Sequence, residues 1–207
     1  MLIGDSHGGD LSQAVIDAGH ELNWNVTVWT HGGNLLQFSK SEYRPRENDV
    51  INSNRILDYV MRTKPDAIVL SQSVHVYDDL DLVKQGLYIL KNESKNILLL
   101  YNRPVFMDNP FQSKSILAEF VKSTDYDESV SINEMQLIHR NSQLDLASYA
   151  SRIGFTTLDT FPVFCNSIAC SRYVNDSWLY SDNNHLSVDG AALLIPSIKN
   201  YLARLEN

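Results

Sequence analysis

The amino-acid sequence predicts an α/β fold in which helices cover both faces of a central parallel sheet. Apolar segments of strand length alternate with segments of helical periodicity along the chain. The strand segments are almost unbroken in their apolar character, as residues 97–101 illustrate, and this is typical of parallel strands buried on both faces. A chain of 207 residues can bury a sizeable core, and we expect one domain over residues 1–207.

Short segments rich in aliphatic, β-branched and aromatic residues predict the strands. In chain order they are residues 1–4, 26–30, 66–71, 97–101 and 155–158. The first is short for a central strand, which usually has about 5 to 6 residues. We therefore expect natural sequence upstream of Met1.

Segments in which apolar residues recur every three or four positions predict the helices. They are residues 10–22, 49–62, 79–92, 131–152 and 187–205. The second is expected to end before Pro65, because the residue that precedes a proline disfavours the helical conformation. Strands separated by helices in this order favour a parallel sheet.

The composition argues against nucleic-acid binding, membrane insertion by this segment and metal binding. The formal net charge is −8, the pI is about 5.1, and no basic run could hold a phosphate backbone. The longest apolar runs are strand-sized, far below the ~20 residues of a membrane span, and no secretory leader follows Met1. His7, His31 and His75 lack the i, i+4 spacing of helical ligand pairs, so we expect no metal and no cofactor.

A candidate nucleophile and a candidate base lie near opposite ends of the chain. Ser6 stands in the sequence Gly-Asp-Ser-His of residues 4–7, and Asp182 precedes His185 by three positions. A serine hydroxyl becomes a good nucleophile when an imidazole accepts its proton and a carboxylate orients that imidazole. The structural alternative makes Ser6 a helix cap and leaves Asp182 and His185 in a solvated turn.

The placement of the loops favours the catalytic interpretation. Ser6, Gly32 and residues 71–75 each follow a predicted strand directly. In an open parallel sheet such loops meet at the carboxyl edge of the strands, where ligands bind. Asp182 and His185 precede the last predicted helix and enter the same edge. We therefore expect these two residues to form a catalytic triad with Ser6.

Cys165 and Cys170 are separated by four residues in a segment with the composition of a loop. A local disulfide is the favoured interpretation and implies an oxidising compartment, whereas two free thiols of a reduced protein are the alternative. A zinc site is disfavoured, because zinc needs further Cys or His ligands at suitable spacing.

With these residues in view, the chain resembles the SGNH, or GDSL-type, hydrolase family over almost its full length. Residues 4–6, Gly-Asp-Ser, look like the block that carries the family's nucleophile. Residues 182–185, Asp-Asn-Asn-His, look like the block that carries its acid and base. The resemblance implies a flavodoxin-like three-layer α/β/α sandwich and acyl transfer through an acyl-Ser6 intermediate, with His185 as the base.

Within that family the chain is most similar to the SGNH domains fused to membrane acyltransferases that O-acetylate bacterial surface polysaccharides. The matches are His7, the cysteine loop 165–170, the segment 102–105 and the closing segment 180–191. The resemblance implies that this domain is part of a longer, membrane-anchored protein whose membrane acyltransferase domain delivers the acyl donor. It also implies a glycan acceptor and a periplasmic or extracytoplasmic location, tethered to the inner membrane.

The oxyanion hole departs from the family pattern. The second block of the family supplies a glycine amide, for which Gly32 is the best match and Gly33 the alternative. The third block usually contains an asparagine, which is absent here and leaves Ser73 or Gln72 as substitutes. The expected oxyanion donors are therefore Ser6, Gly32 and Ser73.

The expected function is O-acyl transfer to a bacterial surface glycan such as lipopolysaccharide O-antigen. His7, His75 and Tyr77 are expected to line the substrate site, and Tyr77 is placed to stack on a sugar ring. Water as the acceptor would instead give a secreted carbohydrate acetyl esterase, because the same triad serves both reactions and only acceptor positioning and water exclusion differ. A non-catalytic glycan-binding domain is the second alternative.

Overall fold

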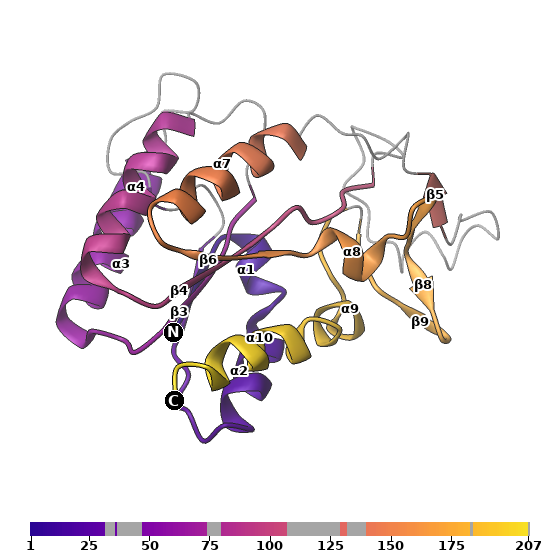
Figure 1. Ribbon diagram of the computed structural model, residues 1–207, viewed down its shortest axis with the longest axis horizontal. Helices are drawn as coiled ribbons and strands as arrows, with labels where there is room; N and C mark the ends of the chain where they lie inside the picture. Colours follow the sequence, from indigo (N-terminus) through magenta and orange to yellow (C-terminus); the bar gives the residue numbers. More distant parts are fainter. Residues whose placement is uncertain are drawn as a thin grey trace.

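The computed structural model describes residues 1–31, 36, 47–73, 80–106, 129–131, 140–182 and 184–206. Within this part, five parallel strands form a central sheet in the order β2-β1-β3-β4-β6 (Figure 1). The strands are β1 (Leu2–Gly4), β2 (Val28–Thr30), β3 (Ile68–Ser71), β4 (Ile97–Tyr101) and β6 (Thr156–Asp159). The predicted α/β class with a parallel sheet is confirmed, and the strand order is that of flavodoxin-like folds.

Helices from both ends of the chain cover one face of the sheet. They are α2 (Ser12–His20), α9 (Val188–Ala192) and α10 (Ile195–Ala203) (Figure 1). Their buried side chains pack against Leu2 of β1 and Leu100 of β4. Segments from the two ends of the chain therefore lie on the same face of the sheet.

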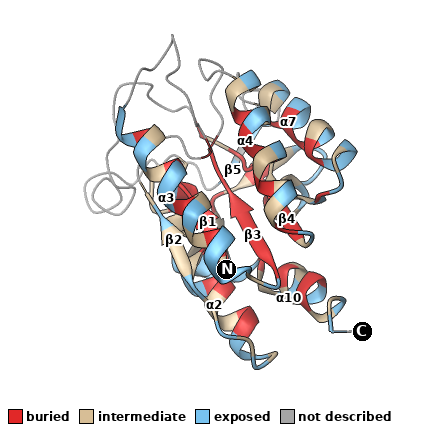
Figure 2. Ribbon diagram, turned by 90° about the vertical axis from the view of Figure 1, so that its left-hand side faces the viewer, coloured by how far each residue is buried: buried red, intermediate tan, exposed pale blue. Residues whose placement is uncertain are grey.

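Helices from the middle of the chain cover the opposite face. They are α3 (Glu47–Thr63), α4 (Leu80–Glu93) and α7 (Arg140–Arg152). They pack against Ile3 and Leu99, which point away from the first face because successive strand residues alternate. Figure 2 shows the buried residues on the helix sides that face the sheet. Each fully buried Leu or Ile contributes about 1.5–3 kcal/mol to folding.

Several helix boundaries differ from the prediction. The segment 10–22 forms α2 only from Ser12, after a separate short helix α1 (Ser6–Gly9). The predicted helix 187–205 is divided into α9 and α10, so the expectation of one continuous helix was wrong. Pro196 lies in the first turn of α10, where its missing amide and fixed φ are tolerated, whereas a proline inside a helix clashes with the preceding turn.

The predicted helix over 131–152 was wrong at its start. Ser131 lies in β5 (Ser129–Ser131), which pairs antiparallel with β7 (Ala169–Ser171). Residues 132–139 fall outside the described part, and α7 begins at Arg140. A strand that pairs with a partner about 40 positions away leaves little local signal in the sequence.

Short elements connect β6 to the closing segment. They are α8 (Phe161–Phe164), β7 and the hairpin of β8 (Tyr173–Val174) and β9 (Ser177–Trp178). Cys165 directly follows α8 and forms a disulfide with Cys170 of β7. Among the described residues, no helix has the length and apolar character that a membrane crossing requires.

Candidate active site

The nucleophile segment, residues 4–10, turns directly from β1 into α1. Asp5 caps this short helix, because its Oδ1 accepts a hydrogen bond of 2.8 Å from the His7 amide. Ser6 is the first residue of α1 and is exposed at the carboxyl edge of the sheet. The cap therefore fixes the turn on which the candidate nucleophile stands.

Gly4 lets the nucleophile segment approach β3 very closely. A Cβ atom built on Gly4 would lie 2.3 Å from the Ser71 carbonyl oxygen and 2.5 Å from the Gly8 Cα. Real Cβ atoms do not come so near to backbone atoms, so any side chain at this position would displace α1 from β3. The glycine that precedes Asp5 thus has a packing reason, which sequence periodicity alone does not show.

The base segment, residues 181, 182 and 184–187, is held by hydrogen bonds among its own side-chain and backbone groups. Asp182 Oδ1 accepts hydrogen bonds from the amides of Asn184 at 2.8 Å and His185 at 2.7 Å. The Ser181 amide donates to the His185 carbonyl oxygen at 2.9 Å. Ser187 then caps α9 by accepting from the Gly190 amide at 3.0 Å. The turn therefore presents the imidazole of His185 toward α1.

The two segments meet in a continuous chain of hydrogen-bonding groups. His185 Nε2 lies 2.8 Å from Ser6 Oγ, and His185 Nδ1 lies 2.6 Å from Asp182 Oδ2. A hydroxyl, an imidazole and a carboxylate in this order can generate a serine nucleophile. The structure thus brings together the three residues that the sequence singles out, although 176 positions separate Ser6 from Asp182.

The pKa shifts of His185 and Asp182 suit a base and the acid that orients it. The hydrogen bond that His185 donates to Asp182 raises the pKa of His185 against the opposing effect of partial burial. Burial acts to raise the pKa of Asp182, but the hydrogen bonds from His185 and the backbone amides outweigh it and lower the pKa below its usual value. Asp182 therefore stays charged at neutral pH and stabilises a protonated His185.

Asp5 ties the nucleophile segment to the loop after β3. Its Oδ2 accepts a hydrogen bond of 2.8 Å from the Ser73 amide, while its Oδ1 holds the His7 amide. Burial raises the pKa of Asp5 to about 7, although the hydrogen bonds from the Ser73 and His7 amides and the charge of Arg103 oppose this shift. The Ser73 amide, which was an expected oxyanion donor, therefore donates its hydrogen bond to Asp5.

Several of the remaining predicted site residues lie outside the described part of the chain. Gly32, His75 and Tyr77 lie outside the described residues, as does the alternative oxyanion residue Gly33. His7 is only 4% exposed, and its ring lies edge-on to the His185 ring with 5.3 Å between centroids. His7 therefore contacts the candidate base directly.

Gln72, the alternative to Ser73 as an oxyanion donor, is buried directly after β3. Its Nε2 has no hydrogen-bond partner within the described part of the chain. It lines a cavity of about 10 Å³ together with His7, Tyr101 and Arg103. That volume is about the least that one water molecule needs. Within the same part of the chain, no cluster of His, Cys, Asp and Glu could hold a metal ion.

Sequence reasoning missed one buried ion pair near the side chains of Ser6 and His185. Arg103 Nη1 lies 2.7 Å from Asp10 Oδ2, and both side chains are almost fully buried. Arg103 was part of the family-like segment 102–105 but had no assigned role. The sequence around Asp10, Gly-Gly-Asp-Leu-Ser, carries no apolar pattern that would mark this residue as buried.

A family model described as the SGNH domain fused to AT3 domains matches residues 1–200. The chain belongs to this family. No curated protein matches the sequence.

Solved structures with the same fold include an acetyltransferase domain and an acetylxylan esterase. The periplasmic domain of a lipopolysaccharide acetyltransferase from Salmonella ser. Paratyphi A aligns with a TM-score of 0.69 and 17% identity over 97% of this chain and 82% of that one. An acetylxylan esterase from Geobacillus stearothermophilus aligns with a TM-score of 0.56 and 15% identity over 97% and 92%. At such identities these similarities establish the fold and leave the reaction open.

Proposed function

We propose that this SGNH domain transfers an acyl group, in the first instance acetyl, to a bacterial surface glycan through an acyl-Ser6 intermediate. The observation that carries the proposal is the Ser6–His185–Asp182 chain at 2.8 and 2.6 Å in a family fused to AT3 domains. The AT3 domain would be the membrane partner that delivers the acyl group. A periplasmic site tethered to the inner membrane follows from that partnership.

In the first half-reaction, His185 Nε2 accepts the Ser6 hydroxyl proton while Ser6 Oγ attacks the acyl carbonyl carbon. The carbonyl electron pair moves onto oxygen, where the backbone amides of Ser6 and Gly32 are expected to stabilise it. Loss of one such donor typically costs about 10²- to 10³-fold in rate. The intermediate then collapses, the protonated His185 gives its proton to the leaving oxygen, and acyl-Ser6 remains.

In the second half-reaction, a hydroxyl of the glycan takes the place of the leaving group. His185 accepts the hydroxyl proton, the hydroxyl oxygen attacks the acyl carbon, and collapse returns the proton to Ser6 Oγ. Asp182 keeps its charge throughout and stabilises the imidazolium that forms in each half. The net change is the movement of one acyl group from donor to sugar.

A carbohydrate acetyl esterase is the second candidate, because Ser6 is exposed and water can reach the acyl group. The similarity in fold to an acetylxylan esterase favours it as well. The two functions differ only in the acceptor, so the same acyl-Ser6 intermediate serves both.

The test is a partition experiment with 4-nitrophenyl acetate as donor and bacterial surface oligosaccharides as acceptors. For a transferase we expect nitrophenolate release to exceed free acetate formation, with the difference recovered as acetylated sugar. Equal nitrophenolate and acetate at every acceptor concentration would identify an esterase. Ser6→Ala is the control for both. Glycan binding without any turnover that depends on Ser6 would instead indicate a non-catalytic binding domain.

A further inference from the structure

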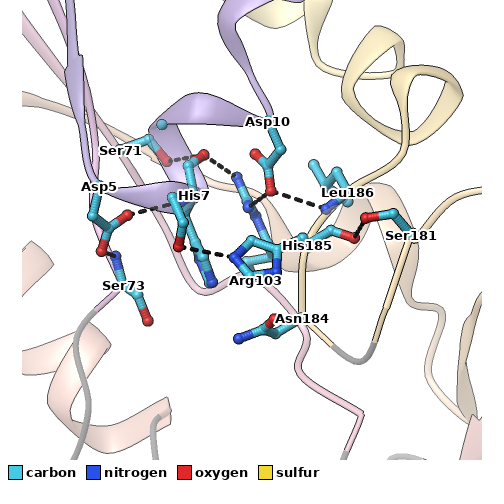
Figure 3. Close-up of polar contacts among 12 residues, drawn as sticks. Asp5, His7, Asp10, Ser71, Ser73, Arg103, Ser181, Asn184, His185 and Leu186 are labelled. Atoms are coloured by element: carbon cyan, nitrogen blue, oxygen red, sulfur yellow. Dashed lines mark hydrogen bonds and ion pairs between the residues drawn. The ribbon is translucent and has the colours of Figure 1, made fainter. Parts of the chain in front are cut away.

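A buried ion pair joins the two segments that carry the triad. Arg103 Nη1 contacts Asp10 Oδ2 at 2.7 Å, and Arg103 Nη2 donates to the His7 carbonyl oxygen at 3.1 Å. The same Asp10 Oδ2 accepts a hydrogen bond of 2.9 Å from the Leu186 amide. Figure 3 shows these contacts converging beside the His185 ring.

The two backbone groups that this network holds adjoin Ser6 and His185 in the sequence. His7 directly follows Ser6, and Leu186 directly follows His185. Arg103 holds the main chain on the nucleophile side, and Asp10 holds it on the base side. The ion pair therefore links the main chain next to Ser6 with the main chain next to His185, the two residues whose Oγ and Nε2 atoms are hydrogen-bonded.

Burial makes the formation of this ion pair costly in free energy. The Arg103 and Asp10 side chains are only 6% and 9% exposed. Desolvating two charges costs several kcal/mol each before their attraction and hydrogen bonds offset it, and apolar residues often stabilise such sites as well or better. A role in stability alone therefore accounts poorly for this pair.

We propose that Asp10 and Arg103 are positioning residues for acyl transfer, which set the distance and angle between Ser6 and His185 by holding the main chain at residues 7 and 186. The proposal rests on the function of Ser6 proposed above. Neither residue touches the reacting atoms, so both act through the triad. Misplacement of reacting groups by about 1 Å can cost about 10²-fold in rate.

The electrostatic environment of His185 gives the pair a second signature. The charged groups that act on this imidazole are Asp182, Asp10 and Arg103, and the His7 ring packs against its edge. After the hydrogen bond to Asp182 and the opposing effect of burial, Asp10 raises the pKa of His185 and Arg103 lowers it. The two neutralising substitutions should therefore shift this pKa in opposite directions.

Three variants test the proposal: Asp10→Asn, Arg103→Gln and the double variant. Each single change leaves one buried charge unpaired and risks unfolding, whereas the double variant removes both charges and keeps the side chains polar. Glu21→Gln is the matched control, because Glu21 forms an exposed ion pair with Lys199 between α2 and α10. Thermal unfolding, the acylation rate with 4-nitrophenyl acetate and the His185 resonances in NMR titrations are measured for each.

In the folded double variant we expect acylation to be about 10- to 100-fold slower with little change in KM, and the hydrogen-bonded Nδ1 proton of His185 to exchange faster. Folded Asp10→Asn should titrate at a lower His185 pKa than the wild type, and folded Arg103→Gln at a higher one. Glu21→Gln should leave the rate, the resonances and the titration unchanged.

The proposal is overturned if the folded double variant acylates at the wild-type rate and keeps the wild-type Nδ1 proton signal. That result would make the pair a stability feature only. If the wild-type chain itself forms no acyl-Ser6, the proposed function fails. The His185 signals of the variants still decide the positioning question in that case, because they need no turnover.

Discussion

The two halves of the candidate site are held in place by different combinations of contacts. The nucleophile segment is held by hydrogen bonds of Asp5 and Arg103 and, in addition, by very close packing, since a Cβ on Gly4 would meet the Ser71 carbonyl oxygen at 2.3 Å. The base segment is partly exposed and is held by hydrogen bonds to Asp182 and Asp10. A substitution at Gly4 should therefore act mainly on folding, and one at Asp182 mainly on catalysis and its pH dependence.

The largest effect is expected in the base segment. Asp182→Asn should slow acylation about 10⁴-fold, because an amide does not hold His185 in the tautomer that accepts the serine proton. The unfolding temperature should change little, since the side chains of Asp182 and His185 are both partly exposed. Nitrophenolate release and calorimetry measure the two quantities. Asp145→Asn, in an exposed ion pair with Lys84, is the control, and a folded Asp182→Asn protein with the wild-type rate would contradict the assignment.

The nucleophile segment should respond in stability, through its close packing at Gly4. Gly4→Ala should cost about 1–3 kcal/mol or more, the usual range for overpacking, because backbone atoms on two sides must move. Gly9→Ala is a matched control in the following helix α1, where the nearest atom to a new Cβ lies 4.0 Å away. It should be neutral or stabilise by about 0.5–1 kcal/mol. Urea unfolding compares them, and equal stabilities would show that packing does not fix this half.

The pH dependence of acylation should show a smaller effect, which again arises in the base segment. The hydrogen bond to Asp182 raises the pKa of His185 above its ordinary 6.5, although partial burial opposes it. His185 accepts the Ser6 proton only when neutral, so the rate should rise with pH through a midpoint above 6.5. Asp182 is already charged over this range, because its pKa is lowered. A midpoint at or below 6.5 in the pH–rate profile would be inconsistent with this geometry.

The sequence predicted the sheet well because its signal is local. Each strand is a short, nearly unbroken apolar segment, and the helices between them show clear periodicity, so strand positions agree within a few residues. The break between α9 and α10 was missed because Leu193 and Leu194 continue the apolar pattern across it. Pro196 was the signal that marked a new first turn.

The remaining features depend on pairing between distant segments. β5 is defined by its partner β7, and Arg103 meets Asp10 across 93 positions. Ser6, Asp182 and His185 could be found from the sequence because their residue types carry a specific chemistry, which a buried ion pair does not. The glycine at position 4 was visible as part of a motif, but its reason became clear only from the contact with β3.

The central claim is that Ser6 carries the acyl group, and mass spectrometry of the quenched protein tests it most directly. After brief incubation with 4-nitrophenyl acetate, an acetyl group should be found on Ser6 of the wild-type chain and on no residue of Ser6→Ala. It should disappear when a sugar acceptor is added, with the acetyl group recovered on the sugar. Acetylated sugar formed equally by the Ser6→Ala protein would contradict the account.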